Sequence, residues 1–317
     1  MKQQEQAVAW VEEMGGLVFR GDDVDDNGKQ ILCFGIGQND MPRHRVAPGF
    51  SAHSSVIRVD LSDKNSRITD LTPFASLISL RTLNLSVTKV TDLSPLGKLA
   101  NLRQLGLVAL GVTDLSPLAE LTNLEELAPL SISTSDLRFL SNLTGLRKLN
   151  LSGRFEDLSP LRNLSELESL VLGGLITSST PSPSIDLSPL ADMKKLSSLI
   201  LGGRSVTDLS PLQNLTVLKD LLLDGTSVSD LLPLSSLRNL ESFSLWNAPV
   251  RDVTPLATLS NLKELDLRGV PIGDLSPLAA LRTLNDLVLQ DTLATDNDIA
   301  ELQKELPHCC ITTAPSD

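Results

Sequence analysis

The chain has 317 residues, a formal net charge of −12, and a composition that is 41% hydrophobic but only 3% aromatic. This acidity argues against nucleic-acid binding, which requires a stripe of Lys and Arg, and against adhesion to anionic lipid. No stretch approaches the roughly 18 consecutive apolar residues of a transmembrane helix.

The N-terminal sequence MKQQEQAVAWVEEMGG lacks the apolar run of a signal peptide. The three cysteines, Cys33, Cys309 and Cys310, form no even disulfide framework. This usage is typical of a reducing compartment, so we expect a cytoplasmic protein unless a leader is removed.

Residues 1–55 lack the repeat described below and are predicted to form an N-terminal cap. Apolar residues recur on one face between Gln3 and Met14, which predicts an amphipathic helix that ends at Gly15. Residues 17–19 and 31–34 predict two strands around an acidic turn. Such a helix and hairpin would cover the open edge of the first repeat.

Within that turn, Asp23, Asp25, Asn27 and Gly28 match the first half of a calcium loop, D-x-[DN]-x-[DN]-G. Phe34 occupies the position where such a loop needs a bidentate Glu, and no helix is predicted after it. The same residue types are common in hairpin turns. We favour the hairpin turn and leave calcium binding open.

Residues 56–296 repeat a leucine frame, seen in LRTLNLSVTKVTDLSPLGKLANL at residues 80–102. One coil cannot bury its own apolar edge, whereas stacked coils can. About 11 coils follow one another, most of them 22 residues long, and those after the first start at Leu80, Leu102, Leu124, Leu146, Leu167, Leu196, Leu218, Leu240, Leu262 and Leu284.

Two stretches depart from this frame. Residues 176–185 are an insertion between two coils. The coil at Leu124 carries Pro129 in place of a strand leucine and Phe139 in place of a proline. We expect a local distortion in that coil.

Most coils carry the motif D-L-S-P-L, as at residues 92–96 and 274–278. Ser is a good helix N-cap and Pro fits the first helical position, so the motif predicts a short helix capped by Ser. The regular spacing of the Asp residues indicates turn and cap chemistry rather than paired catalytic carboxylates. Because strands stack about 4.8 Å apart, closer than helices can, we predict a curved, right-handed α/β solenoid with parallel strands on the concave face and short helices or turns on the convex face.

The frame LxxLxLxxxxVxDLSPLxxLxN resembles the 22-residue class of leucine-rich repeats of bacterial internalins and of the regulatory subunit of protein phosphatase 1, over about three quarters of the chain. In that family an Asn after the strand bonds the neighbouring backbone. The position here holds Thr88, Leu110, Ile132, Arg154, Arg204, Thr226, Ala248 and Val270. Thr can donate a similar bond, and elsewhere we predict that the backbone groups pair with water or with one another.

Residues 297–317 are predicted to form a C-terminal cap. Asn297 or Asp298 would begin a helix, and Ile311 would add a last strand. The apolar face of that helix would be Ile299, Leu302 and Leu306.

His308, Cys309 and Cys310 follow one another, and neighbours in sequence cannot all face one ion, so we favour thiols in a cap over a metal site. The chain contains no phosphate loop, nucleophile elbow or HExxH motif. We predict no catalytic activity, no metal and no cofactor.

Strand residues that alternate with the inward leucines face outward. In chain order, the residues between the two strand leucines are Asn84, Gly106, Ala128, Asn150, Val171, Ile200, Leu222, Ser244, Asp266 and Val288. Val171, Ile200 and Leu222 are consecutive in this series, so we expect them side by side, with Trp246 next to them. The residues around them are small or charged: Gly173, Gly174, Gly202, Gly203, Asp220, Asp224, Glu264, Asp266, Arg268 and Asp286.

An apolar centre with a Trp and a charged rim is typical of a binding surface, although β-branched residues also simply favour strands. The sequence therefore predicts a non-catalytic, monomeric scaffold that binds a protein or peptide on its concave face. The alternative is a small enzyme, or a phosphatase-regulator-like protein, that uses the array as a platform. The predicted binding residues are Val171, Ile200, Leu222, Trp246, Asp224, Asp266 and Arg268.

Overall fold

The computed structural model describes residues 2–13, 17–20, 56–61, 68–85, 89–107, 112–131, 135–153, 155–173, 184–202 and 206–313. The chain forms two compact units, unit 1 (Met1–Thr134) and unit 2 (Ser135–Asp317). The boundary falls in the coil at Leu124. In that coil the strand pairing shifts by one residue. Leu105 of the preceding strand pairs with Leu127, but Leu107, two residues further on, pairs with Leu130, so the later strand has one extra residue between the two pairs. The predicted distortion is confirmed, and its cause is that Pro129 has no N–H to give to a ladder.

Unit 1 begins with a cap and continues as parallel coils. Strand β1 pairs antiparallel with β2, and β2 to β5 then pair parallel in sequence order. The elements are α1 (Lys2–Glu13), β1 (Leu17–Arg20), β2 (Val56–Asp60), η1 (Thr72–Ser76), β3 (Thr82–Asn84), η2 (Ser94–Lys98), β4 (Gln104–Leu107), η3 (Ser116–Glu120) and β5 (Glu126–Ser131), where η denotes a 3-10 helix.

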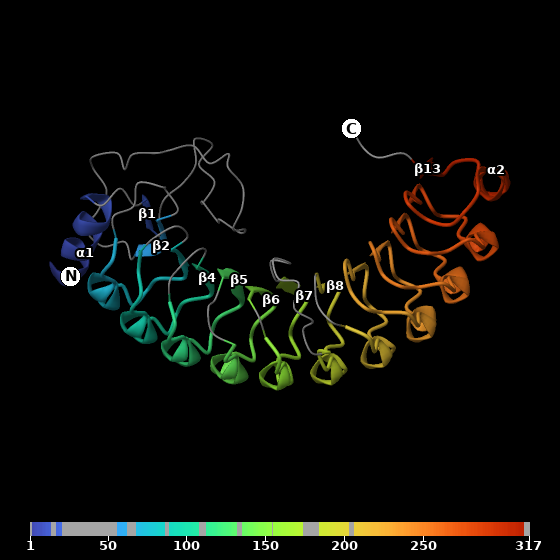
Figure 1. Ribbon diagram of the computed structural model, residues 1–317. Helices are drawn as coiled ribbons and strands as arrows, with labels where there is room; N and C mark the ends of the chain where they lie inside the picture. The colour runs from blue at the N-terminus through green and yellow to red at the C-terminus, as the bar shows by residue number, and fades with distance from the viewer. Residues whose placement is uncertain are drawn as a thin grey trace. The chain divides into compact units, whose positions relative to one another are not determined.

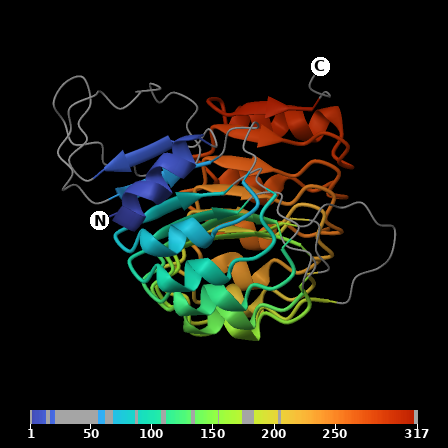
Figure 2. The ribbon, with the colours of Figure 1, turned by 90° about the vertical axis from the view of Figure 1, so that its left-hand side faces the viewer.

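Helix α1 covers the first coil, beside η1 in Figure 2. Its Trp10 ring meets Phe74 of η1 edge-on at 5.9 Å between centroids. The Gln4 side-chain amide donates to the Ser76 carbonyl at 3.0 Å. The predicted capping helix and the strand at 17–19 are confirmed, whereas residues 31–34 and the turn from Asp23 to Gly28 lie outside the described residues.

Unit 2 is an array of parallel strands that pair in sequence order, with the strands on the inner side of the curve and the 3-10 helices on the outer side (Figure 1). This is the predicted solenoid. Its elements are η4 (Arg138–Asn142), β6 (Lys148–Ser152), η5 (Ser159–Leu161), β7 (Ser169–Gly173), η6 (Ser188–Leu190), β8 (Ser198–Ile200), η7 (Ser210–Leu212), β9 (Asp220–Leu222), η8 (Leu232–Ser236), β10 (Ser242–Ser244), η9 (Thr254–Thr258), β11 (Glu264–Asp266), η10 (Ser276–Ala280), β12 (Asp286–Val288), α2 (Asp296–Glu305) and β13 (Cys310–Thr312).

The leucines of the frame fill the interior of each coil. In β9, Leu221 is fully buried while Asp220 and Leu222 on either side are partly exposed, as alternation across a strand requires. Both leucines of D-L-S-P-L are also buried, for example Leu209 and Leu212. Identical layers of Leu therefore stack from coil to coil, which is why an almost purely aliphatic composition suffices for this core.

The cap of each 3-10 helix is the Asp of D-L-S-P-L, not the predicted Ser. The N–H of Ser210 donates to Asp208 Oδ1 at 2.8 Å, and the same bond recurs from Ser94 to Asp92. Hydrogen bonds from Ser210, through its side chain and then its backbone N–H, hold the pKa of Asp208 below its ordinary value of 3.8. The Asp lies two residues before the N–H it accepts from, in a local turn, while Leu209 at the N-cap position itself makes no side-chain hydrogen bond to the helix.

After the strands, the backbone closes its own bend. The N–H of Ala248 donates to the carbonyl of Leu245. The backbone N–H of the preceding residue, Asn247, donates to the carbonyl of Arg268 in the next coil at 2.8 Å. The Asn247 position is left-handed in four successive coils, occupied by Gly225, Asn247, Gly269 and Asp291. Here the prediction that backbone groups pair with one another is confirmed. The Thr226 hydroxyl bonds Leu223 of its own coil rather than a neighbouring coil.

An Asn ladder does exist, but at the turn that leads into the strand. Asn261 Nδ2 donates to the Arg238 carbonyl of the preceding coil at 2.9 Å. The same bond is made by Asn101, Asn123 and Asn239, and by the Thr283 hydroxyl. The sequence analysis did not assign this role, although the Asn before the first leucine recurs at the repeat spacing.

The N-cap of helix α2 lies two residues before Asn297, the earlier of the two predicted caps. Thr295 is its N-cap, and the Asp298 carboxylate accepts back from the Thr295 N–H at 2.8 Å, which completes a capping box. Neither Asn297 nor Asp298 is therefore the cap. The last strand is confirmed, since Ile311 of β13 pairs with Leu287 of β12.

We predict that the Asp caps make the fold acid-sensitive. A carboxylate whose folded pKa is depressed stabilises the fold above its unfolded pKa, and this contribution is lost as pH falls through the folded value. Asp208→Ala should lower the urea midpoint at pH 7, whereas Asp208→Asn keeps an acceptor oxygen and should keep the midpoint near wild type. The Asn variant should lose less stability than wild type between about pH 5 and about pH 3. If urea titrations showed the same pH dependence of stability for wild type and Asp208→Asn, this role of Asp208 would be contradicted.

We predict that the Asn ladder stabilises the array. Asn261→Ala removes one inter-coil hydrogen bond, so we expect a loss of about 1 kcal/mol in the free energy of unfolding. Asn285→Ala is the matched control, because the Asn285 side chain makes no hydrogen bond among the described residues. Chemical denaturation of both variants measures the difference, and equal stabilities would refute the ladder.

Candidate binding face

The strand registers bring the predicted apolar residues together on unit 2. Val171 lies opposite Ile200, and Ile200 opposite Leu222, on β7, β8 and β9. All three side chains are partly exposed. We call Val171, Ile200 and Leu222 the apolar row. Its existence as a contiguous row was predicted from the repeat spacing, and its use in binding stays a prediction.

A second row of outward positions lies two residues further along each strand, and in the coil after Leu222 this position holds Trp246. Trp246 is 46% exposed. Its backbone N–H donates to Asp224 Oδ1 of the preceding coil at 3.1 Å, and the Ser244 hydroxyl bonds the same oxygen. The Arg268 guanidinium of the following coil lies over its ring, 5.8 Å from the centroid. Trp246 is therefore held from both sides while part of its ring faces solvent.

The Arg268 guanidinium is itself fixed. Its Nε donates to both carboxylate oxygens of Asp266, at 3.1 Å to Oδ1 and 2.9 Å to Oδ2. Its Nη2 donates to Oδ2 at 2.5 Å. The hydrogen bonds to Asp266, followed by its charge, raise the pKa of Arg268. The structure thus brings together the four predicted residues Asp224, Trp246, Asp266 and Arg268 as one connected cluster.

Glycines border the apolar row on the side of that cluster. A Cβ placed on Gly202 would meet no heavy atom of the described residues within 4 Å, and one on Gly173 would meet only the Ser152 hydroxyl, at 3.9 Å. Among the described residues, the space that a side chain would take at these two glycines is therefore open. Gly174, Gly203 and insertion residues 176–183 lie outside the described residues.

Carboxylates border the face on its other side. Asp220, Glu264 and Asp286 lie in register on β9, β11 and β12, and we call them the acidic row. Burial, then the nearby charge of Glu241, raises the pKa of Asp220. Glu241 itself lies on the flank between Lys219 and Lys263, and hydrogen bonds from both ammonium groups lower its pKa to about 2.

Unit 1 differs at the equivalent positions. There Thr82, Gln104 and Glu126 form a chain of side-chain hydrogen bonds, at 3.1 Å from Thr82 to Gln104 and 3.3 Å from Gln104 to Glu126. These three positions match those of the acidic row, and here the polar groups bond to one another. At the positions of the apolar row, unit 1 carries Asn84, Gly106 and Ala128, so no aliphatic row forms there. The strand face of unit 2 is therefore the better candidate for a binding site.

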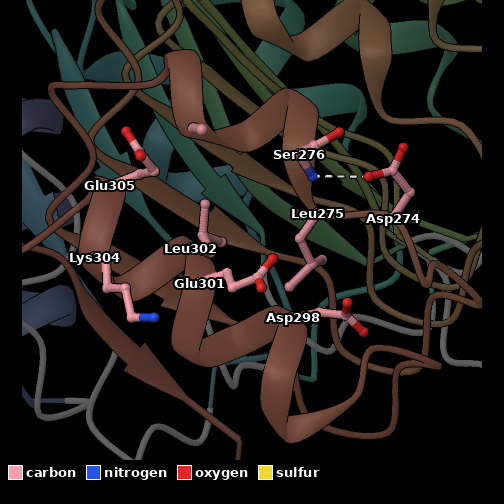
Figure 3. A pocket seen from close by; sticks show the side chains of 9 residues that line it. Asp274, Leu275, Ser276, Asp298, Glu301, Leu302, Lys304 and Glu305 are labelled. Carbon is pink, nitrogen blue, oxygen red and sulfur yellow. Dashed lines mark hydrogen bonds between the residues drawn. The ribbon is translucent and has the colours of Figure 1, made fainter.

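A cavity of about 470 Å³ lies between α2 and η10 (Figure 3). Its lining carboxylates already have local partners. Asp274 accepts from the Ser276 N–H, Asp298 belongs to the capping box of α2, and Glu305 pairs with Arg282. These acids serve helix ends and an ion pair, so we assign the cavity no ligand.

The cysteines near the C-terminus differ in environment. Cys309 is buried and Cys310 is exposed, and both are free thiols. Burial, then the charge of Asp286, raises the pKa of Cys309 to about 11. Within the described part of the chain, no three His, Cys, Asp or Glu side chains are grouped to hold a metal, and no helix has the length and apolarity to span a bilayer.

The repeat and the stacked parallel strands define a leucine-rich-repeat solenoid. The chain is internalin-like: it is similar to an internalin (inlF) of Listeria monocytogenes, with 29% identity over 80% of this chain and 73% of that chain, and a TM-score of 0.68.

Two further matches show the fold alone. A leucine-rich-repeat protein of Leptospira interrogans is 23% identical over 76% of this chain and 62% of its own, with a TM-score of 0.64. The plant peptide hormone receptor RGFR1, in complex with RGF2, is 17% identical over 78% of this chain and 45% of its own, with a TM-score of 0.61. No protein-family model matches the chain, nor does any curated protein.

We predict that Arg268 shields one face of the Trp246 ring. In a Trp10→Phe background, Trp246 is the sole tryptophan. Adding Arg268→Ala should then increase acrylamide quenching and shift the emission to longer wavelength, because water reaches the exposed ring face. Arg282→Ala, which removes an Arg that pairs with Glu305 instead, is the control. Unchanged quenching in the Arg268 variant would show that the contact does not persist in solution.

Proposed function

We propose that the chain is a non-catalytic module that binds a protein or peptide on the strand face of unit 2. The observation that carries this proposal is the contiguous apolar row beside an exposed Trp246 whose ring contacts Arg268. Isolated apolar residues are common on protein surfaces, whereas a row that adjoins an exposed Trp is typical of interfaces. The packing of the coils does not require this row, since its side chains point away from the leucine core.

The way Trp246 is held supports a role as an anchor. Binding costs free energy when mobile side chains must be ordered. The Arg268 contact already orders the Trp246 ring in the free protein, and the Asp224 bond fixes the backbone that carries it. A partner that covers its ring therefore gains apolar burial at a reduced ordering cost.

The comparisons support the same class of function. Leucine-rich-repeat proteins of the internalin-like kind are typically non-catalytic. One of the matching plant structures is a peptide hormone receptor bound to RGF2. At 17% identity that likeness concerns the fold, so the peptide-binding function enters only as support for our proposal.

The proposal predicts that Trp246→Ala weakens partner binding by about 2 kcal/mol, roughly thirtyfold in Kd. Proteins retained from a lysate of the source organism would be compared between wild type and variant by quantitative mass spectrometry. The retained protein would then be purified and titrated against both.

Leu232→Ser is the matched control for that experiment. Leu232 is 65% exposed on η8, away from the strands, and Ser restores the D-L-S-P-L motif there. The control should bind like wild type. Equal affinities for wild type and Trp246→Ala, with both proteins folded by circular dichroism, would refute the proposed face.

A further inference from the structure

The charges on the strand face of unit 2 are unevenly distributed. At β9 to β12 and the residues just after these strands, the face carries one cationic side chain, Arg268, which Asp266 already neutralises. Against it stand five carboxylates: Asp220, Asp224, Glu264, Asp266 and Asp286. The apolar row lies at β7 to β9, so the two kinds of surface meet at β9.

Acidic side chains on the flank of the array behave differently. Glu241 pairs with two lysines, Glu168 with Arg147 and Glu166 with Lys195. On the face, by contrast, Asp220 and Asp286 make no ion pair or hydrogen bond among the described residues, and Glu264 bonds only the Ser242 hydroxyl there. The flank acids are held in ion pairs, whereas Asp220, Glu264 and Asp286 form none among the described residues. The charge of Lys219 also acts on Asp220, but the Lys219 ammonium is paired with Glu241 on the flank.

Strand β9 shows how the two surfaces adjoin. Asp220, Leu222 and Asp224 alternate with buried leucines, so all three project from the same face. Each carboxylate lies two residues from Leu222, roughly 7 Å along the strand. A Lys or Arg side chain can lay its aliphatic stem on Leu222 and bring its charge to either carboxylate.

We propose that the partner is an extended polypeptide segment in which a short aliphatic stretch adjoins two or more Lys or Arg residues. The aliphatic stretch lies on the apolar row, and the basic residues lie over β9 to β12 against the acidic row. The row crosses three strands, roughly 10 Å, which is the reach of three or four extended residues. This inference rests on the proposed function, because it specifies the chemistry of the partner for the same face.

The probe for this inference is a phage-displayed library of random 12-residue peptides, selected on the full-length protein. The expected result is enrichment of sequences in which aliphatic and basic residues form adjacent blocks. Synthetic peptides of the enriched sequences would be titrated, together with scrambled versions of the same composition. We expect the scrambled peptides to bind at least about tenfold more weakly, and salt to weaken binding since it screens exposed charges.

The decisive variant is the triple neutralisation Asp220→Asn, Glu264→Gln and Asp286→Asn, which should weaken the enriched peptides about tenfold or more. Its matched control, Glu120→Gln, Asp192→Asn and Glu301→Gln, removes the same number of charges from the helix-bearing side of the coils. The control should retain binding, and circular dichroism would verify that both variants are folded.

Three other outcomes would overturn the inference in distinguishable ways. Enriched peptides that are neutral or acidic, and that lose binding with Trp246→Ala, would refute the basic partner while leaving the proposed face intact. Equal losses in the two triple variants would show that only net charge matters. Failure to enrich any peptide that depends on Trp246 or the apolar row would refute both the inference and the proposed function.

Discussion

Every coil depends on its neighbours, because alone it cannot bury its leucines or pair its strand. The same dependence explains the repeated inter-coil bonds: the strand ladders, the Asn ladder that includes Asn261, and the left-handed bend in which Asn247 donates to the next coil. Each of these uses backbone carbonyls that the adjacent coil presents at a fixed spacing. The residues of the leucine frame are needed for this stacking, whereas the residue type can vary at positions whose side chains point out of the stacked core.

The outward strand positions are where this freedom is visible. Unit 1 fills them with Thr82, Gln104 and Glu126, which bond to one another. Unit 2 fills them with an apolar row, Trp246 beneath Arg268, and carboxylates such as Asp220 and Asp286 that form no ion pair among the described residues. The scaffold is the same in both units, so the difference in surface chemistry is what favours unit 2 as the binding face.

The wrong predictions share one cause. Ser is a good N-cap for an α-helix, but here Ser210 is itself the first residue of a 3-10 helix, and its N–H finds its acceptor in Asp208. Likewise Thr295 rather than Asn297 caps α2, because only Thr295 and Asp298 can bond reciprocally. Residue preference alone could not show at which residue each helix starts, and the start decides which N–H groups need a side-chain acceptor. The cytoplasmic location and monomeric state stay predictions.

The sequence by itself determined the solenoid, the stacking of Val171, Ile200 and Leu222, and the position of Trp246 beside them. A strict repeat allows this, since spacing along the chain fixes spacing across the strands. Only the tertiary structure decided that Arg268 covers Trp246 while Asp266 fixes Arg268, and that Asp220 and Asp286 form no ion pair among the described residues. Those facts depend on side-chain directions between coils, and repeat spacing places Cα atoms without choosing which charged groups meet.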